Sequence, residues 1–202
     1  MNLLKSYLRR KTAYYKSYYY KNTFFIYNFK DHYLQLNLND LYNTQTSILF
    51  KGKVKFGANF FEVNSILGKS HFKIEDENIK NYVTIYYKSK IANLKNKSQL
   101  HFYNQHFFFG VQFFPYLSTQ EKNELLNLIK IKYQLPLSLT LPITVKDKDE
   151  NILVVRENMG LLLEYFSGDK LLVNSVLEAF EKEEQKALLK QKEAHQIILK
   201  SI

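Results

Sequence analysis

The chain has 202 residues, of which 46% are hydrophobic and 24% charged, a composition typical of a folded globular protein of one or two domains. It has no cysteine, which excludes disulfides, thiolate metal sites and cysteine nucleophiles, and its 6 glycines form no cluster of the kind that cradles phosphate. Lys and Arg outnumber Asp and Glu by 29 to 19, so the net charge is +10.

The sequence predicts neither a membrane span nor a secretory signal. No apolar run approaches the roughly 18 residues of a transmembrane helix. Residues 1–11 alternate short apolar stretches with charge, unlike the continuous apolar core of a signal peptide. We therefore expect a cytoplasmic protein. An organellar matrix is the alternative, because residues 1–30 contain no acid.

The first 30 residues combine positive charge with aromatic side chains. They hold seven Lys or Arg and ten aromatic residues before the first acid, Asp31. Lysine and arginine neutralise phosphates and aromatic rings stack on unpaired bases, so this arm could contact RNA or an anionic surface. The candidate contact residues are Arg9, Arg10, Lys11, Lys16, Tyr14, Tyr18, Tyr19 and Tyr20. The pattern favours the structural alternative, an exposed helix followed by a first strand with its lysines in water.

Two strands are expected early in the chain. Residues 22–29 are rich in aromatic residues, and residues 33–38 alternate apolar and polar residues, so together they predict a hairpin. The polar, turn-rich stretch at 39–46 then marks a boundary. We expect residues 1–45 to form a basic aromatic appendage.

The middle of the chain predicts a strand, a helix and an aromatic hairpin. Residues 48–56 alternate enough for a strand, and a helix at about 59–67 follows, opened by an Asn59–Glu62 capping box. Residues 82–88 are aromatic and β-branched, as in strands. The strongest hairpin signal is at 100–114, where two apolar runs flank a turn.

The last third predicts a helix, a meander and a second helix. A capping box, Ser118 to Glu121, opens a helix at about 118–133. Four short strands with turn residues between them are expected at 143–145, 152–155, 161–165 and 171–173. The final helix is expected at 175–199. The fold class is therefore α+β with a predominantly antiparallel sheet, and the domains are the appendage, an α+β core at 46–174 and a C-terminal helix at 175–202.

One segment has the spacing of a known family. The matching residues are Gly57, Val63, Leu67 and Gly68. This spacing resembles the SmpA/OmlA family, the small lipoprotein subunit of the outer-membrane assembly machine, in which proline usually stands at the position of Ser70. The resemblance spans about residues 56–114. The resemblance implies a compact α+β domain that binds other proteins and does no chemistry. This sequence departs from the family in showing no lipoprotein signal.

Candidate metal ligands are few. His101 and His106 flank the hairpin turn and could approach each other, but no acid stands beside them, so structural or surface roles are favoured. Residues 147–151 resemble the start of a calcium loop, but Ile152 replaces its glycine and Asn158 its final glutamate, so an acidic hairpin turn is expected. The sequence predicts no catalytic residue, cofactor or metal ligand.

The expected function is non-catalytic: a binding or assembly subunit of a larger intracellular complex, with other protein subunits as partners. Three consecutive phenylalanines at 107–109 require both faces of one strand to be covered, and an uncovered face would be an interface. The expected interface residues are Phe107, Phe109, Ile197, Ile198 and Leu199. The alternatives are a nucleic-acid-associated basic protein of a ribosome-like particle, bound through residues 1–30, and an enzyme whose site residues are scattered in sequence.

Overall fold

The computed structural model describes residues 29–36, 38, 40–91 and 93–201, with side chains through residue 196. The chain divides into two compact units, Met1–Gln35 and Leu36–Ile202. This division falls earlier than the expected boundary at residue 45, because residues 41–43 already pair with the main sheet. The C-terminal helix belongs to the second unit.

The first unit contains one described element, helix α2 (Phe29–Leu34). The strand expected at 33–38 is therefore wrong at Tyr33 and Leu34, and residues 22–28 of the expected hairpin lie outside the described residues. The rings of Phe29 and Tyr33 are 5.3 Å apart, four residues apart in sequence, which is the spacing of a helical side-chain pair. The alternation that suggested a strand is short enough for a local helical contact to override it.

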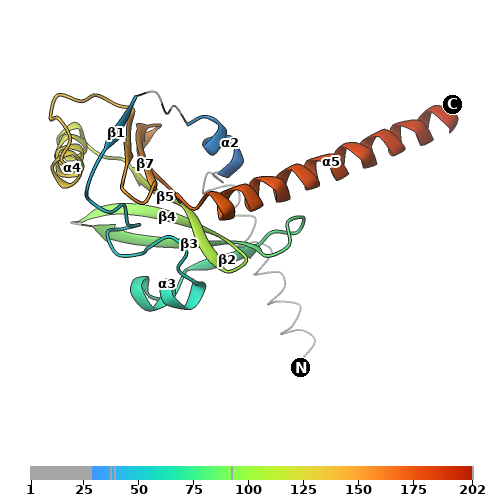
Figure 1. Cartoon of the computed structure of the whole chain (residues 1–202), viewed down its shortest axis with the longest axis horizontal. Coiled ribbons are helices and arrows are strands. Elements are labelled where there is room, and N and C mark those ends of the chain that lie inside the picture. The colour runs from blue at the N-terminus through green and yellow to red at the C-terminus, as the bar shows by residue number, and fades with distance from the viewer. Residues whose placement is uncertain (1–28, 37, 39, 92, 202) are drawn as a thin grey trace. The chain divides into compact units, whose positions relative to one another are not determined.

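The second unit is built on one sheet (Figure 1). This sheet has eight strands in the order β1-β6-β7-β8-β5-β4-β3-β2. All neighbouring strands run antiparallel except β1 and β6, which are parallel. The strands are β1 (Leu41–Asn43), β2 (Phe72–Glu75), β3 (Tyr82–Ile91), β4 (Leu94–Tyr103), β5 (His106–Pro115), β6 (Ile143–Lys146), β7 (Ile152–Glu157) and β8 (Gly160–Phe166). The expected α+β class with a predominantly antiparallel sheet is confirmed.

Three helices accompany the sheet: α3 (Phe60–Leu67), α4 (Thr119–Lys132) and α5 (Lys170–Ser201). The first two begin where their capping boxes predict. Asn59 accepts from the backbone of Glu62, and Ser118 accepts from the backbone of Glu121. The motif residues of the SmpA/OmlA resemblance, at 57–68, thus lie on and beside this capped helix α3, which ends at Gly68, whose φ is +81°.

Helix α5 begins five residues before the expected start at residue 175, and it absorbs the strand expected at 171–173. The Asp169 carboxylate accepts from the backbone N–H groups of Leu171 and Leu172, which makes Asp169 the helix cap. Ser175, where the helix was expected to begin, lies inside the helix and donates its hydroxyl to the carbonyl of Leu171. Two capping signals stand close together here, and the earlier one is used.

Residues 48–56 form no strand. The backbone reverses at Lys51 and Gly52, whose φ angles of 51° and 69° are left-handed, and only Phe50 and Val54 bridge to each other. The side chains of Ile48, Phe50 and Val54 are nonetheless fully buried. The apolar residues that suggested a strand therefore cover the sheet as a loop.

The main core lies on one face of the sheet, which we call the inner face. Loop residue Phe50, α3 residue Val63 and α4 residue Ile129 pack there with strand residues such as Ile85 and Leu100. The strand residues on the opposite face, which include Tyr86, Phe109 and Phe166, are also buried. Both faces of the central strands are therefore covered.

Candidate functional site

The structure corrects the expectation that Phe107 presents an apolar face to a partner. Its side chain is fully buried on the inner face. The ring stacks on Phe56 at 5.1 Å between centroids and meets Phe50 and Phe102 at 5.6 and 5.8 Å. Phe107 is a residue of the hydrophobic core.

Phe109 is also fully buried, on the opposite face of the sheet. Its ring lies 4.9 Å from Phe166 on the neighbouring strand and 5.0 Å from His101. The register shift between His101 and Phe102 sits beside this triple-phenylalanine stretch and alters the strand alternation locally. The three consecutive rings therefore indicate a strand covered on both faces, not a surface open to partners.

The remaining predicted contact residues lie where the structure gives no side-chain description. Ile197, Ile198 and Leu199 are in the last turns of α5, and their side chains lie outside the described set. The candidate nucleic-acid contacts of the arm, within residues 9–20, also lie outside the described residues. Their roles stay predictions.

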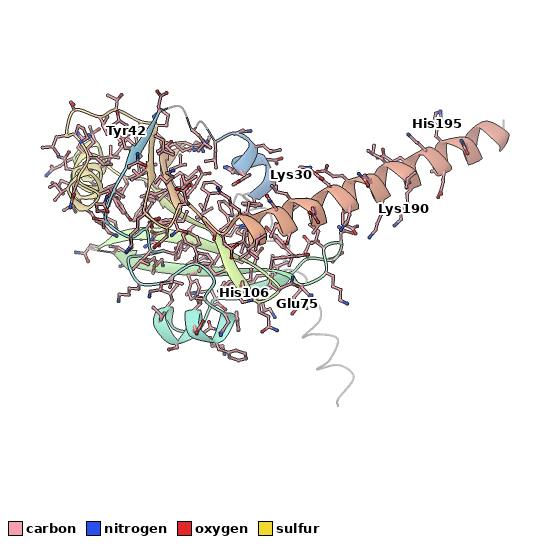
Figure 2. All side chains as sticks on the ribbon, viewed as in Figure 1. Lys30, Tyr42, Glu75, His106, Lys190 and His195 are labelled. Atoms are coloured by element: carbon pink, nitrogen blue, oxygen red, sulfur yellow. The ribbon has the colours of Figure 1, made fainter. Side chains whose placement is uncertain are left out.

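The first exposed surface is the second half of α5. Near its start, Val173 and Val176 are buried, and the ring of Phe180 meets that of Tyr82 at 5.4 Å. Beyond that contact, residues 181–196 are almost all exposed (Figures 1 and 2). We call this stretch the α5 arm.

Two adjacent leucines stand out on the α5 arm. Leu188 is 56% exposed and Leu189 is 60% exposed, whereas the surrounding side chains are mostly charged. Pairs such as Lys186 with Glu183 at 2.5 Å add only a few tenths of a kcal/mol each to such a helix. The sequence predicted a partner contact at residues 197–199 of this helix and did not predict one at these leucines. Two adjacent leucines in a charged helical stretch are the signal that could have indicated them.

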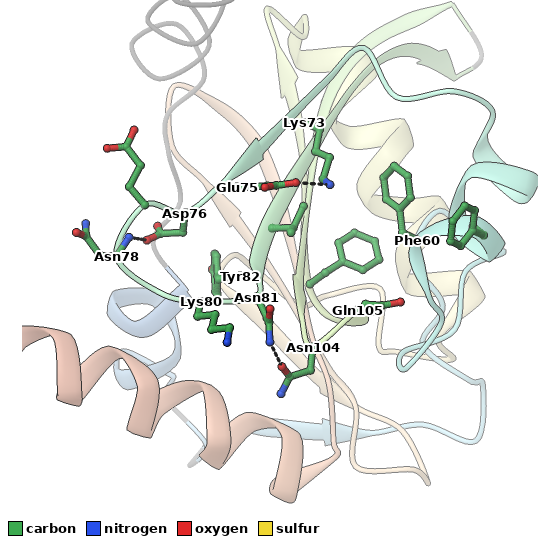
Figure 3. Close-up of a pocket in the computed structure, with 14 residues that line it drawn as sticks. Phe60, Lys73, Glu75, Asp76, Asn78, Lys80, Asn81, Tyr82, Asn104 and Gln105 are labelled. Carbon is green, nitrogen blue, oxygen red and sulfur yellow. Dashed lines mark hydrogen bonds and ion pairs between the residues drawn. The ribbon is translucent and has the colours of Figure 1, made fainter.

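The second exposed surface is a cleft of about 910 Å³ beside β2, which we call the β2 cleft (Figure 3). Its lining includes Phe60 and Phe61 at the start of α3 and residues of the β2–β3 turn and the β4–β5 turn. Phe61 is 78% exposed, the opposite of the buried rings on β5. The sequence signal for this residue is the doubled phenylalanine in a one-sided helix, where only one of the two rings can face the core.

Charged side chains give the β2 cleft a defined electrostatic character. Lys73 and Glu75 form a 2.6 Å ion pair, and this hydrogen bond and charge lower the pKa of the Glu75 carboxyl. The Lys73 ammonium also lies 5.5 Å from the centre of the Phe60 ring, a cation–π distance. With Asp76, Glu77 and Lys80, the lining contains two lysines and three carboxylates, so the cleft is slightly acidic in a basic chain.

A half-buried lysine and a half-buried serine lie close together on the inner face. The Lys51 ammonium donates to Ser89 Oγ at 2.8 Å, and burial lowers the pKa of Lys51 to about 8. A lysine of this kind can serve as the base for a serine nucleophile. Here, however, the Ser89 hydroxyl donates its proton to Asn96 Oδ1 at 3.0 Å and only accepts from Lys51. This polarity fits a structural ammonium and not a general base.

The histidines do not form the half-site that their spacing allowed. His101 is buried, with Nδ1 2.6 Å from the Tyr82 hydroxyl and Nε2 2.8 Å from Gln99 Nε2. His106 is exposed and its Nδ1 lies 3.0 Å from the carbonyl oxygen of Gly57. The two imidazoles thus serve separate local contacts. Among the described residues, no group of three or more His, Asp or Glu side chains could hold a metal ion.

The segment that resembles a calcium loop is a hairpin turn, as expected. The Asp147 carboxylate accepts from the backbone N–H groups of Asp149 and Asn151, each at 2.9 Å. It also accepts from the Asn151 amide and, at 2.7 Å, from the distant backbone N–H of Ile48. These donors occupy both carboxylate oxygens, so Asp147 ties the inner-face loop to the β6–β7 turn.

Comparison of the chain with protein-family models, curated proteins and solved structures found no match. In the part of the chain that the structure describes, no helix has the length and apolar character needed to cross a bilayer.

Proposed function

We propose that the protein is a non-catalytic subunit of a larger protein assembly and that the α5 arm carries the contact with a partner. The single observation behind this proposal is a long helix whose second half is exposed and bears an apolar pair, Leu188 and Leu189. The resemblance to the SmpA/OmlA family points to the same class of function. We also propose a cytoplasmic location, with an organellar matrix as the alternative.

The physical argument concerns what an exposed helix can do. Helices in proteins owe most of their stability to packing of an apolar face, and short isolated helices are marginal in water. The α5 arm gains only weak support from its own charge pairs. Burial of two leucines against a partner would contribute about 1.5–3 kcal/mol each, enough to fix the arm in a complex. The partner that fits is an apolar helix or groove of another protein.

The test is purification of the tagged full chain from its own cells, with and without nuclease. It compares wild type, the double variant Leu188→Asp/Leu189→Asp and the matched control Lys190→Glu, which lies beside the leucines on the exposed arm. We expect the same proteins to accompany wild type and the control after nuclease treatment, and to be lost from the double variant. Thermal unfolding of the three proteins should coincide, because the leucines are exposed.

Two results would contradict the proposal. Equal recovery of the same proteins with wild type and the double variant would show that the leucines of the α5 arm do not contact the partner. Companions that disappear with nuclease, leaving nucleic acid in the untreated sample, would instead support the alternative in which the basic residues of 1–30 contact RNA.

A further inference from the structure

Among the described residues, no strand pairs with the outer edge of the sheet at β2. β2 is the last strand in the order, paired on one side with β3. The Asp76 N–H donates to the carbonyl of Tyr82 at 2.9 Å, and bonds to one antiparallel neighbour recur at every second residue. Ile74 and Phe72 therefore direct their backbone groups to β3. The N–H and C=O groups of Lys73 and Glu75 point outward from the sheet.

The side chains of these two residues carry opposite charges on one face. Lys73 and Glu75 stand opposite Ile85 and Val83 of β3, so they share the inner face with the β2 cleft (Figure 3). Both are well exposed, with 43% and 72% of their side-chain surface accessible. The open edge thus presents a positive and a negative residue, with Ile74 between them.

We propose that two copies of the chain associate by antiparallel pairing of β2 with β2 of the second copy, about a two-fold axis at Ile74. In this register Lys73 stands opposite Glu75 of the second copy, and Glu75 stands opposite Lys73 of the second copy. The backbone N–H and C=O groups of Lys73 and Glu75 are the ones that point outward, so both are hydrogen-bonded pairs of an antiparallel ladder. In each pair the two opposite residues exchange two main-chain hydrogen bonds. The sequence of the edge is self-complementary, as a two-fold interface requires.

Charge selects this register over its neighbours. Moving the axis to Lys73 places Lys73 opposite itself, and moving it to Glu75 places Glu75 opposite itself. Like charges directly opposite each other destabilise a strand pair, whereas opposite charges stabilise it. The backbone groups allow all three registers, and only the one centred on Ile74 pairs every charge with its opposite.

The apolar lining of the β2 cleft fits the same arrangement. Side chains that face one way on paired strands share one face of the joined sheet, so the α3 helices of both copies lie on that face. Each contributes Phe60 and the exposed Phe61 to the space over the joined edge. The pairing therefore extends the interface beyond the main-chain bonds and accounts for a large exposed ring at this position.

The test uses the full chain and two charge-reversal variants, Lys73→Glu and Glu75→Lys, in sedimentation equilibrium. We expect wild type to have twice the mass of the 24.1 kDa chain, and each variant alone to dissociate at least tenfold more readily. The control Lys148→Glu, an exposed reversal in the β6–β7 turn, should stay dimeric.

Mixing the two variants is the decisive step. Neither variant can form the Lys73–Glu75 pair within its own chain, but in a mixed dimer every position 73 meets an opposite charge at position 75 of the other copy. We expect the equimolar mixture to recover the dimer that each variant lacks. A monomeric wild type, variants that stay dimeric or a mixture that stays monomeric would each overturn the proposal. Because no residue of α5 is changed, this outcome is independent of the α5 arm.

Discussion

Replacement of Asp147 by alanine should destabilise the fold more than any other single change in the turns. Asp147 is 3% exposed, and its carboxylate accepts four hydrogen bonds, from the backbone N–H groups of Ile48, Asp149 and Asn151 and from the Asn151 amide. Three of these donors are local, and water can reach them when the carboxylate is removed. The Ile48 N–H is buried, ninety-nine residues away in sequence, and has no such replacement.

The magnitude follows from these two groups of bonds. An unsatisfied buried N–H costs about 1–3 kcal/mol. The loss of charge-assisted bonds to partly buried donors adds roughly 1 kcal/mol or more for the turn, since net contributions of bonds to charged groups run at about 1.5–3 kcal/mol each before water compensates. We expect Asp147→Ala to lower the free energy of unfolding by about 2–4 kcal/mol, a large part of the 5–15 kcal/mol typical of a domain.

Equilibrium denaturation of Asp147→Ala beside Asp149→Ala is the assay. Asp149 lies in the same turn and is exposed, so its replacement should change the unfolding free energy by no more than about 0.5 kcal/mol. Hydrogen exchange then localises the effect, because the Ile48 amide should be protected in wild type and exchange much faster in Asp147→Ala. A loss below 1 kcal/mol, or an unchanged Ile48 exchange rate, would refute the view that this carboxylate fastens the inner-face loop.

Three further predictions concern the core and its charges. Phe107→Ala should lower the unfolding free energy by about 3–5 kcal/mol, because Phe107 is fully buried, whereas Phe61→Ala should leave it nearly unchanged, because Phe61 is exposed. Equal effects of the two substitutions in equilibrium denaturation would contradict this difference in burial. Gly110→Ala should cost about 1–3 kcal/mol in the same assay, because the added Cβ would lie 2.6 Å from the Phe50 ring; no change would show that the ring moves freely. Burial lowers the pKa of Lys51 from 10.5 to about 8, so between pH 8 and 10.5 the unfolded chain binds more protons than the folded chain. The unfolding free energy of wild type should therefore rise with pH in this range relative to that of Lys51→Met. Parallel pH profiles of the two proteins would contradict this prediction.

The elements that the sequence predicted well are those fixed by neighbouring residues. The capping boxes at Asn59 and Ser118 placed the starts of α3 and α4, because each box satisfies backbone groups of the same helix turn. The hairpin of β4 and β5 followed from two apolar runs around a short turn. These signals depend on contacts between residues close in sequence, so they predict local structure without knowledge of the tertiary fold.

The elements that it missed depend on contacts distant in sequence. Residues 48–56 alternate like a strand, yet the left-handed Lys51–Gly52 reversal and the bond from Ile48 to Asp147 make them a covering loop. A pattern of apolar residues specifies which side chains are buried but not which backbone buries them. The same limit explains Phe107 and Phe109, where three consecutive rings correctly indicated two covered faces and left open what covers them.

The candidate surfaces were hidden for a related reason. That β2 is an edge strand follows only from the strand order, in which this four-residue strand is the last of a sheet whose described strands lie between residues 41 and 166. The opposite charges of Lys73 and Glu75 therefore indicate no interface from the sequence alone, because the sequence does not show that they lie on an edge strand. The exposure of Leu188 and Leu189 likewise follows from where α5 loses contact with the sheet, after Phe180 meets Tyr82.

The two proposed contacts make a joint prediction about stoichiometry, because they share no residue. A dimer paired through β2 carries two α5 arms, so a partner with one binding site should form a complex of two chains and two partners. Lys73→Glu should then halve the mass of that complex and leave the affinity per arm unchanged, since distant independent sites act additively. If the same variant weakens partner binding by about 10²–10⁴, the partner engages both arms at once and the dimer supplies the effective concentration. Titration of wild type and Lys73→Glu against the purified partner, with the complex mass measured in parallel, separates these two cases.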